Sequence, residues 1–209
     1  MASSDPARLA FWCLGAFLAG SIPFGLLLVK VAGKGDVRRH GSGNIGATNV
    51  SRVGGKALGV LTLLLDILKG GLSVWLARRA GLDYNFVALV GFLAVAGHVF
   101  TPWLKFQGGK GVATALGAAF ALDPVWILPS LGLFAVLLAL FRFVSLGSVA
   151  GAALMPLVLV FRKPPGPVWP GLLLWAATFF LVIAKHHENI RRLLKGEESP
   201  LWGRKEARG

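Results

Sequence analysis

The sequence predicts an all-α integral membrane protein, a polytopic bundle of about seven transmembrane helices. Of the 209 residues, 55% are hydrophobic and only 15% are charged, whereas about a quarter of the residues in a soluble domain are charged. The apolar residues form long runs, and the cations lie between those runs. The excess of 22 Lys and Arg over nine Asp and Glu therefore indicates an anionic membrane face or an anionic small molecule as partner, and no nucleic acid.

Each predicted helix corresponds to one apolar run. A helix that crosses a bilayer needs about 20 mostly apolar residues, with about 17 as the lower bound. The runs that meet this requirement are residues 9–31, 57–77, 84–104, 125–141, 144–161 and 168–184. A further run, 112–122, has only eleven residues and ends at the helix-breaking pair Asp123-Pro124. It becomes long enough only if its helix begins near Gly108 or Gly111.

The distribution of cations favours seven crossings over six. With seven, the segments 33–56 and 105–111, Arg142 and the C-terminal tail share one side, which then holds 15 Lys and Arg against five on the other. Cytoplasmic segments are enriched in Lys and Arg. We therefore predict a multi-pass protein of the cell (inner) membrane, with its N-terminus outside and its C-terminus in the cytoplasm.

The chain is predicted to form a single transmembrane domain, residues 1–209, because no linker or internal repeat divides it. Three polar segments are candidates for the chemistry: 33–56, 105–114 and 185–198. All three lie on the predicted cytoplasmic side. Residues 199–209 are polar and are predicted to form a flexible tail.

The first polar segment contains the stretch GSGNIGATN. Its glycines, Gly41, Gly43 and Gly46, permit left-handed backbone and allow successive amides to point at an anion. Arg52 and two further arginines flank the stretch, and a guanidinium fork suits phosphate or carboxylate oxygens. The neutral hydrogen-bonding side chains of the stretch are Ser42, Asn44, Thr48 and Asn49. The segment is a candidate phosphate site; the alternative is a flexible basic loop that touches lipid headgroups.

The second polar segment contains GGKGVAT, residues 108–114. Gly108, Gly109 and Gly111 surround Lys110, and Thr114 follows. If a helix begins near Gly111, its free amides and its dipole face the same anion as Lys110. The stretch is not a Walker A loop, because the spacing of that motif is absent. The alternative is a turn between helices with one lysine that faces headgroups.

The third polar segment is AKHHENIRRLLKGEE, residues 184–198. His186, Asn189 and Arg192 are three residues apart, so they share one face of a helix. Histidine carries protons near neutral pH, and asparagine holds an oxygen or orients a base. The alternative is an interfacial histidine without a role in chemistry.

Two polar features lie inside apolar runs. Asp66 and Lys69 are three residues apart and can pair, which is needed because a charge at the bilayer centre costs about 2.5–3.5 kcal/mol on insertion scales. The pair is either structural or part of a proton path. Ser145 and Ser148 begin the run 144–161 on the predicted cytoplasmic side, where serines also serve in helix packing.

The three polar segments together resemble those of the bacterial acyl-phosphate-dependent glycerol-3-phosphate acyltransferases, the PlsY family. The matching stretches are GSGNIGATNVSR, FQGGKGVAT and HHENIRRLLKGEE, in that order, with further similarity in GSIPFG, DILKG, GHVFTP and SLGS. The resemblance covers residues 20–198. Two departures are Ile45, where proline is common, and Gln107, where lysine is common before the glycines.

The resemblance implies transfer of a fatty acyl group from acyl phosphate to the sn-1 hydroxyl of glycerol 3-phosphate, which gives lysophosphatidate and phosphate, the first acylation of phospholipid synthesis. The implied catalytic residues are Ser42, Arg52, Lys110, Ser145, His186 and Asn189. The implied substrate-binding residues are Gly43, Asn44, Gly46, Thr48, Asn49, Gly108, Gly109, Gly111 and Thr114. Glu198 is expected to be structural, and either His186 or a phosphate oxygen of the donor accepts the proton.

The sequence also argues against other classes. Thioester-dependent acyltransferases often carry a His-x₄-Asp motif, and no histidine of this chain has an aspartate at that spacing. The nine scattered acids do not form the carboxylate cluster of a magnesium-dependent transferase, so no metal and no cofactor is expected. The main alternative is a small anion or phosphate transporter. Membrane lipid is an expected partner, and no particular oligomeric state is predicted.

Overall fold

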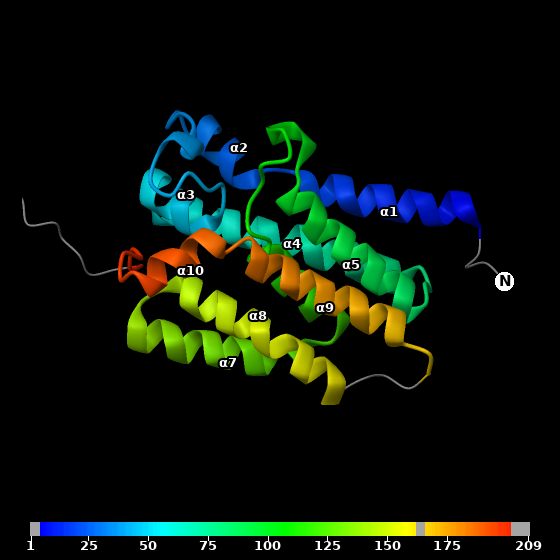
Figure 1. Cartoon of the computed structure of the whole chain (residues 1–209). Coiled ribbons are helices and arrows are strands. Elements are labelled where there is room, and N and C mark those ends of the chain that lie inside the picture. Colours follow the sequence, from blue (N-terminus) through cyan, green and yellow to red (C-terminus); the bar gives the residue numbers. More distant parts are fainter. Residues whose placement is uncertain (1–4, 162–165, 202–209) are drawn as a thin grey trace, which may run out of the picture.

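The computed structural model describes residues 5–161 and 166–201, and every regular element within those ranges is a helix. The α-helices are α1 (Pro6–Ser21), α2 (Phe24–Val31), α3 (Ala47–Gly54), α4 (Lys56–Arg79), α5 (Tyr84–Val99), α6 (Val112–Leu122), α7 (Pro124–Phe141), α8 (Val144–Phe161), α9 (Trp169–Ala184) and α10 (His187–Leu194). Two 3₁₀ helices are η1 (Val37–Arg39) and η2 (Pro102–Leu104). The long helices lie side by side, with α3 and α10 at one end of the bundle and the start of α1 at the other (Figure 1).

The helices have the lengths and surfaces of a membrane bundle. Among the described residues, four helices are long and apolar enough to cross a bilayer, and up to six crossings result if the bent pairs α1–α2 and α9–α10 each count as one. Large apolar side chains such as Phe180, Leu173 and Leu140 are exposed on the outer faces, as lipid contact requires. The main buried core includes Trp175, Phe179 and residues of α5, α6 and α8. The predicted all-α membrane fold is confirmed.

The predicted helix 9–31 is not continuous. It breaks at Ile22–Pro23, and α1 and α2 meet at 42°. Proline has no N–H to donate, so carbonyls before it lose their helical partners. Thr101 Oγ1 donates to the Ser21 carbonyl at 2.7 Å, and Lys69 Nζ donates to the Ile22 carbonyl at 2.9 Å. The break is therefore stabilised by side chains from two other segments.

The predicted helix 84–104 is also shorter than expected, because α5 ends at Val99. The chain then turns through η2, and Lys105 and Phe106 adopt left-handed backbone with φ of 52° and 63°. The Gly108 amide donates to the Val99 carbonyl at 3.0 Å. This return brings the second polar segment back across the end of α5.

The short helix α6 packs closely on α4 because both present glycine at the contact. A β-carbon at Gly70 would lie 2.1 Å from the Thr114 carbonyl oxygen, and one at Gly117 would lie 1.9 Å from the Ile67 carbonyl oxygen. Small residues allow such backbone approach in membranes. Since α6 starts at Val112, this packing fixes the end of the loop that carries Lys110.

The direction of α6 agrees with the arrangement that seven crossings need. Its first residue follows the second polar segment, and its last turn reaches the opposite end of the bundle, where Arg78 Nη1 donates to the Ala121 and Leu122 carbonyls at 2.6 Å each. The eleven residues of α6 rise about 16 Å, roughly half of the hydrocarbon thickness. The number of crossings stays a prediction.

Candidate active site

The first polar segment is folded around Asn49. This side chain is 2% exposed, and its Nδ2 donates to the carbonyls of Val37, His40 and Asn44 at 3.1, 3.1 and 2.9 Å. Its Oδ1 accepts from the Ser42 amide at 2.9 Å. The amide of Asn49 is thus fully used inside the loop. Asn49 therefore holds the loop together, and its role in substrate binding stays a prediction.

The glycines shape this loop rather than line it with free amides. Gly41 and Gly43 have φ of +60° and +69°, and a β-carbon at Gly41 would lie 2.2 Å from Asn49 Oδ1. The Gly43 amide donates to the His40 carbonyl, and the Gly46 amide donates to Asn44 Oδ1. These amides are therefore committed to the loop, and the predicted anion site at Gly43 and Gly46 is not formed by their N–H groups.

The groups that the first segment leaves accessible are side chains. Ser42 is exposed, Thr48 is partly buried, and Arg52 projects from α3 with an exposed guanidinium. Arg52 Nη2 donates to the Ser199 carbonyl at 3.2 Å. Residues 199–201 of the predicted flexible tail therefore lie against the site, whereas 202–209 lie outside the described residues.

The second polar segment forms a loop that runs over the end of α5. The Gly109 amide donates to the His98 carbonyl at 3.1 Å, and a β-carbon at Gly108 would lie 2.0 Å from the same oxygen. Gly111, with φ of +83°, precedes α6, and no side chain caps that helix. The first amides of α6 are therefore available near Lys110, as the sequence predicts.

Lys110 joins the second segment to the third. Its Nζ donates to Asn189 Oδ1 on α10. The pKa of Lys110 is lowered to about 8, chiefly because the group is buried; Arg192 and Arg52 also lower it, while Glu198 and Glu188 act in the opposite sense. The ammonium is charged at neutral pH and lies in a place where water competes little for an anion.

The third segment is organised by Glu198. Its Oε1 accepts from Asn189 Nδ2 at 2.6 Å and from Ser145 Oγ at 2.7 Å, and its Oε2 accepts from Arg192 Nε at 2.7 Å. Burial alone would raise the pKa of Glu198, but these three hydrogen bonds outweigh it and lower the pKa. The carboxylate is therefore ionised, and it holds three predicted polar side chains together in the structural role that the resemblance implies.

His186 lies in the turn between α9 and α10, not inside a helix as the three-residue spacing predicts. It is 3% exposed, whereas its neighbour His187 is exposed. His186 Nδ1 lies 2.7 Å from the Val182 carbonyl oxygen. Because a carbonyl only accepts, Nδ1 carries the proton and Nε2 of the neutral ring has a free lone pair. The buried histidine is thus the one built into the site.

Two further residues that the sequence singled out, Thr114 and Ser148, are buried within helices. Thr114 is fully buried where α6 meets α4, its hydroxyl oxygen has no hydrogen-bond partner among the described residues, and its role in substrate binding stays a prediction. Ser148 Oγ donates to the Val144 carbonyl within α8, whereas Ser145 reaches Glu198. Of the two serines, Ser145 belongs to the site.

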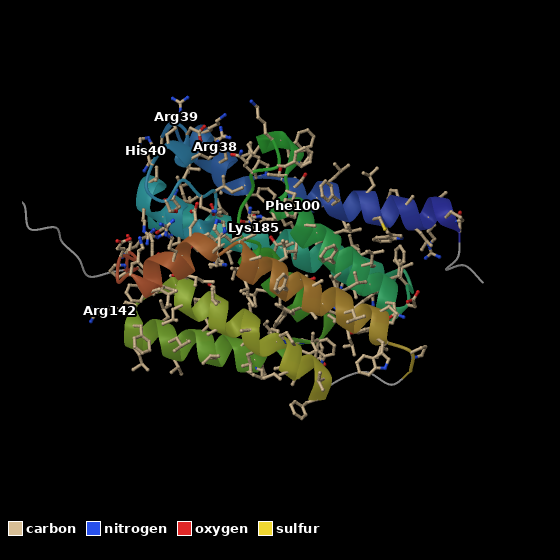
Figure 2. All side chains as sticks on the ribbon, in the orientation of Figure 1. Arg38, Arg39, His40, Phe100, Arg142 and Lys185 are labelled. Atoms are coloured by element: carbon tan, nitrogen blue, oxygen red, sulfur yellow. The ribbon has the colours of Figure 1, made fainter. Side chains whose placement is uncertain are left out.

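The assembled centre therefore contains Ser145, His186 and Asn189 at the meeting of α8, α9 and α10, Lys110 from the second loop, and Arg52 beside residues 198–199. Figure 2 shows that Arg38, Arg39, His40 and Arg142 lie toward the same end of the bundle, and that Lys185 lies beside Phe100. Lys185 Nζ is 5.7 Å from the Phe100 ring centre. Cations from separate segments thus lie at the end of the bundle that holds the polar centre.

One residue that contacts the second loop was not identified from the sequence. His98 of α5 is 5% exposed, contacts Lys69, and packs its ring against the loop at Gly109. The stretch GHVFTP contains it, but a histidine in an apolar run gives no indication of what it faces. The predicted pairing of Asp66 with Lys69 is confirmed, with Lys69 Nζ 2.8 Å from Asp66 Oδ1.

The fold and the site define a helical membrane protein with a polar, cationic centre at one end of the bundle. A sequence profile described as glycerol-3-phosphate acyltransferase matches residues 10–196. Curated relatives with that name include proteins of Trichlorobacter lovleyi, 51% identical over 90% of this chain and 95% of the relative, and of Geobacter sulfurreducens, 49% identical over 88% and 93%.

Solved structures agree with the sequence comparisons. A crystal structure of PlsY, an integral membrane glycerol 3-phosphate acyltransferase in its glycerol 3-phosphate form, superposes with a TM-score of 0.87 at 38% identity over 94% of this chain and 96% of that one. A lysophosphatidic acid form gives a TM-score of 0.83 over 92% and 95%. The chain belongs to the glycerol-3-phosphate acyltransferase family and is an acyltransferase of the membrane.

The low pKa of Lys110 predicts a pH dependence. Lysine is charged below its pKa, so the charge is present at pH 7 and lost as pH rises through about 8. We expect kcat/KM of the wild-type enzyme to fall about tenfold per pH unit above that value. Lys110→Arg, whose guanidinium stays charged, is the control: its kcat/KM, although lower, should stay level up to about pH 10. A wild-type profile that is level to pH 10 would contradict this assignment.

Proposed function

We propose that this acyltransferase takes its acyl group from a fatty acyl phosphate and transfers it to the sn-1 hydroxyl of glycerol 3-phosphate, releasing phosphate. The observation that carries the proposal is the presence of two cationic groups, Lys110 from the loop before α6 and Arg52 from α3, at one polar centre. Two anionic substrates need such an arrangement, since each brings a phosphate that must be held close to the other. A centre for a single phosphate would need only one of these two cationic groups.

The second loop suits the phosphate of the donor. Lys110 supplies a charge, and the uncapped first turn of α6 supplies amides and a positive dipole end. Leaving phosphate gains negative charge during the transfer, so groups placed there stabilise the transition state. The tail of the donor gains about 0.8 kcal/mol per buried CH₂ and remains in lipid or between helices.

The first segment suits the acceptor. A hollow of about 450 Å³ is lined by Lys34, His40, Gly41, Arg52 and Val53. It is open to the surface, so a small water-soluble phosphate ester can enter it. Arg52 offers a guanidinium fork that matches phosphate oxygens, and the Ser199 carbonyl that it now contacts is a weak competitor for that cation.

The transfer itself requires no enzyme-bound acyl group, because acyl phosphate is already an activated anhydride. The acceptor hydroxyl oxygen forms a bond to the acyl carbon, and the bond from that carbon to the phosphate oxygen breaks. The phosphate leaves with the bonding electron pair. The hydroxyl proton passes to Nε2 of His186, which has a free lone pair. Asn189 and Ser145, both held by Glu198, orient Lys110 and the reacting groups.

We further propose that the site faces the cytoplasm of the inner membrane, with the N-terminus outside. The support is the concentration of Lys and Arg in the segments around the site. A transport function is less well supported, since the polar segments gather at one end of the bundle instead of lining its depth.

The donor is tested by phosphate release from the purified full-length protein in detergent, with palmitoyl phosphate and glycerol 3-phosphate and without added metal. We expect acceptor-dependent release and an equal amount of lysophosphatidate. Lys110→Ala should lose at least about a hundredfold in kcat/KM, whereas Lys105→Ala, an exposed lysine of the same turn, should retain activity. Transfer from acyl-CoA or acyl-carrier protein but not from palmitoyl phosphate would contradict the proposed donor.

His186→Gln tests the proton acceptor. We expect turnover to fall by roughly 10²–10⁴-fold with KM for glycerol 3-phosphate near normal, as for loss of a general base. His187→Gln is the matched control and should keep nearly full turnover, because His187 is exposed. A loss of less than about tenfold in His186→Gln would assign the proton to a phosphate oxygen of the donor.

A further inference from the structure

We propose that His98 is a positioning residue for the acyl transfer: its ring, fixed by the buried Asp66–Lys69 pair, supports the loop 108–111 and so sets the place of Lys110. The inference rests on the proposed function of that loop. It gives a role to three buried polar residues of α4 and α5 that the proposed chemistry does not otherwise use.

The ammonium of Lys69 is buried among three polar neighbours. Its Nζ lies 2.8 Å from Asp66 Oδ1, 2.9 Å from the Ile22 carbonyl oxygen and 2.8 Å from His98 Nδ1. The side chains of Lys69 and Asp66 are each 4% exposed. The ammonium donates hydrogen bonds to the Ile22 carbonyl and to His98 Nδ1, and its charge is balanced by the carboxylate of Asp66. Complete pairing of this kind is what a charge inside a membrane bundle requires.

The contact with Lys69 fixes the tautomer of the His98 imidazole. Because Lys69 only donates, Nδ1 of His98 accepts, and the ring proton of the neutral imidazole is on Nε2. Nε2 faces the loop: a β-carbon at Gly109 would lie 2.0 Å from it and 2.8 Å from Cε1. Rotation of the ring would therefore break its hydrogen bond with Lys69. The ring also prevents the loop from moving closer to α5 at Gly109.

His98 is connected to the site through the loop that carries Lys110. The Gly109 and Gly108 amides donate to the His98 and Val99 carbonyls, so His98 contacts the loop through both its backbone and its ring. Lys110 follows directly and reaches Asn189 from this position. Misplacement of a reacting group by 1 Å can lower a rate about 10²-fold. Support of the loop at Gly109 is therefore support of the catalytic lysine.

His98→Asn separates this role from that of the ion pair. Asparagine keeps a short acceptor for Lys69 but lacks the ring atoms that face Gly109. We expect kcat/KM to fall by about 10- to 100-fold with an unfolding temperature near that of Ser73→Ala. Ser73 is the matched control, a buried hydroxyl of α4 that donates to the Lys69 carbonyl. Wild-type kcat/KM in His98→Asn would overturn the proposal.

A double-mutant cycle distinguishes positioning from a general loss of structure. If the ring acts through Lys110, His98→Asn should cost less than about threefold when Lys110 is already alanine, because coupled residues are non-additive. The residual rates are measurable with radiolabelled glycerol 3-phosphate at high enzyme concentration. An equal loss in both backgrounds would show that His98 acts on the fold and would overturn the proposal.

Gly109→Ala examines the same contact from the loop side, and it decides the matter if His98→Asn does not fold. We expect at least tenfold lower kcat/KM, because the added β-carbon meets the ring and displaces the loop; full activity would overturn the proposal. The wild type separates the two levels of inference. An inactive wild type contradicts the proposed function, whereas an active wild type with an equally active His98→Asn contradicts only the role of His98.

Discussion

The site depends on one side-chain amide, that of Asn189. Its oxygen accepts from Lys110 and its nitrogen donates to Glu198, so the amide dipole lies between a cation and an anion and is oriented by both. This orientation links the loop before α6 to α10 and to the residues that follow it. Through Glu198 the link extends to Ser145 on α8 and to Arg192. Three parts of the chain thus become one site through a single neutral residue.

The membrane makes such links necessary. Apolar helices have little hydrophobic reason to choose one neighbour over another in lipid, so close backbone contact and polar pairing decide their arrangement. Glycines bring α4 against α6, and Thr101 and Lys69 satisfy the carbonyls where α1 and α2 break. These contacts fix the positions of α1, α2, α4 and α6, the helices that flank the first and second polar segments. Charges that would be costly alone are retained because each has a partner.

Composition and run length were sufficient to predict the helical membrane fold. Residue type with spacing singled out Lys110 and Asn189, which the fold brings into contact, and His186; their catalytic roles stay predictions. The break at Pro23 was missed because the apolar run continues through it. Asn49 and Thr114 are both buried, which the sequence does not reveal because it gives the type of a side chain but not its direction. Ser145 meets Glu198 across 53 residues, a contact that only the tertiary fold reveals.

The central claim is that Asn189 and Lys110 act as a unit. The most direct measurement is kcat/KM for Lys110→Ala, Asn189→Ala and the double variant, each verified to fold. The account predicts that the double variant is within about threefold of the worse single variant, because either change breaks the same link. If the two losses instead multiply, the residues act independently, and the amide is not the connection on which the site depends.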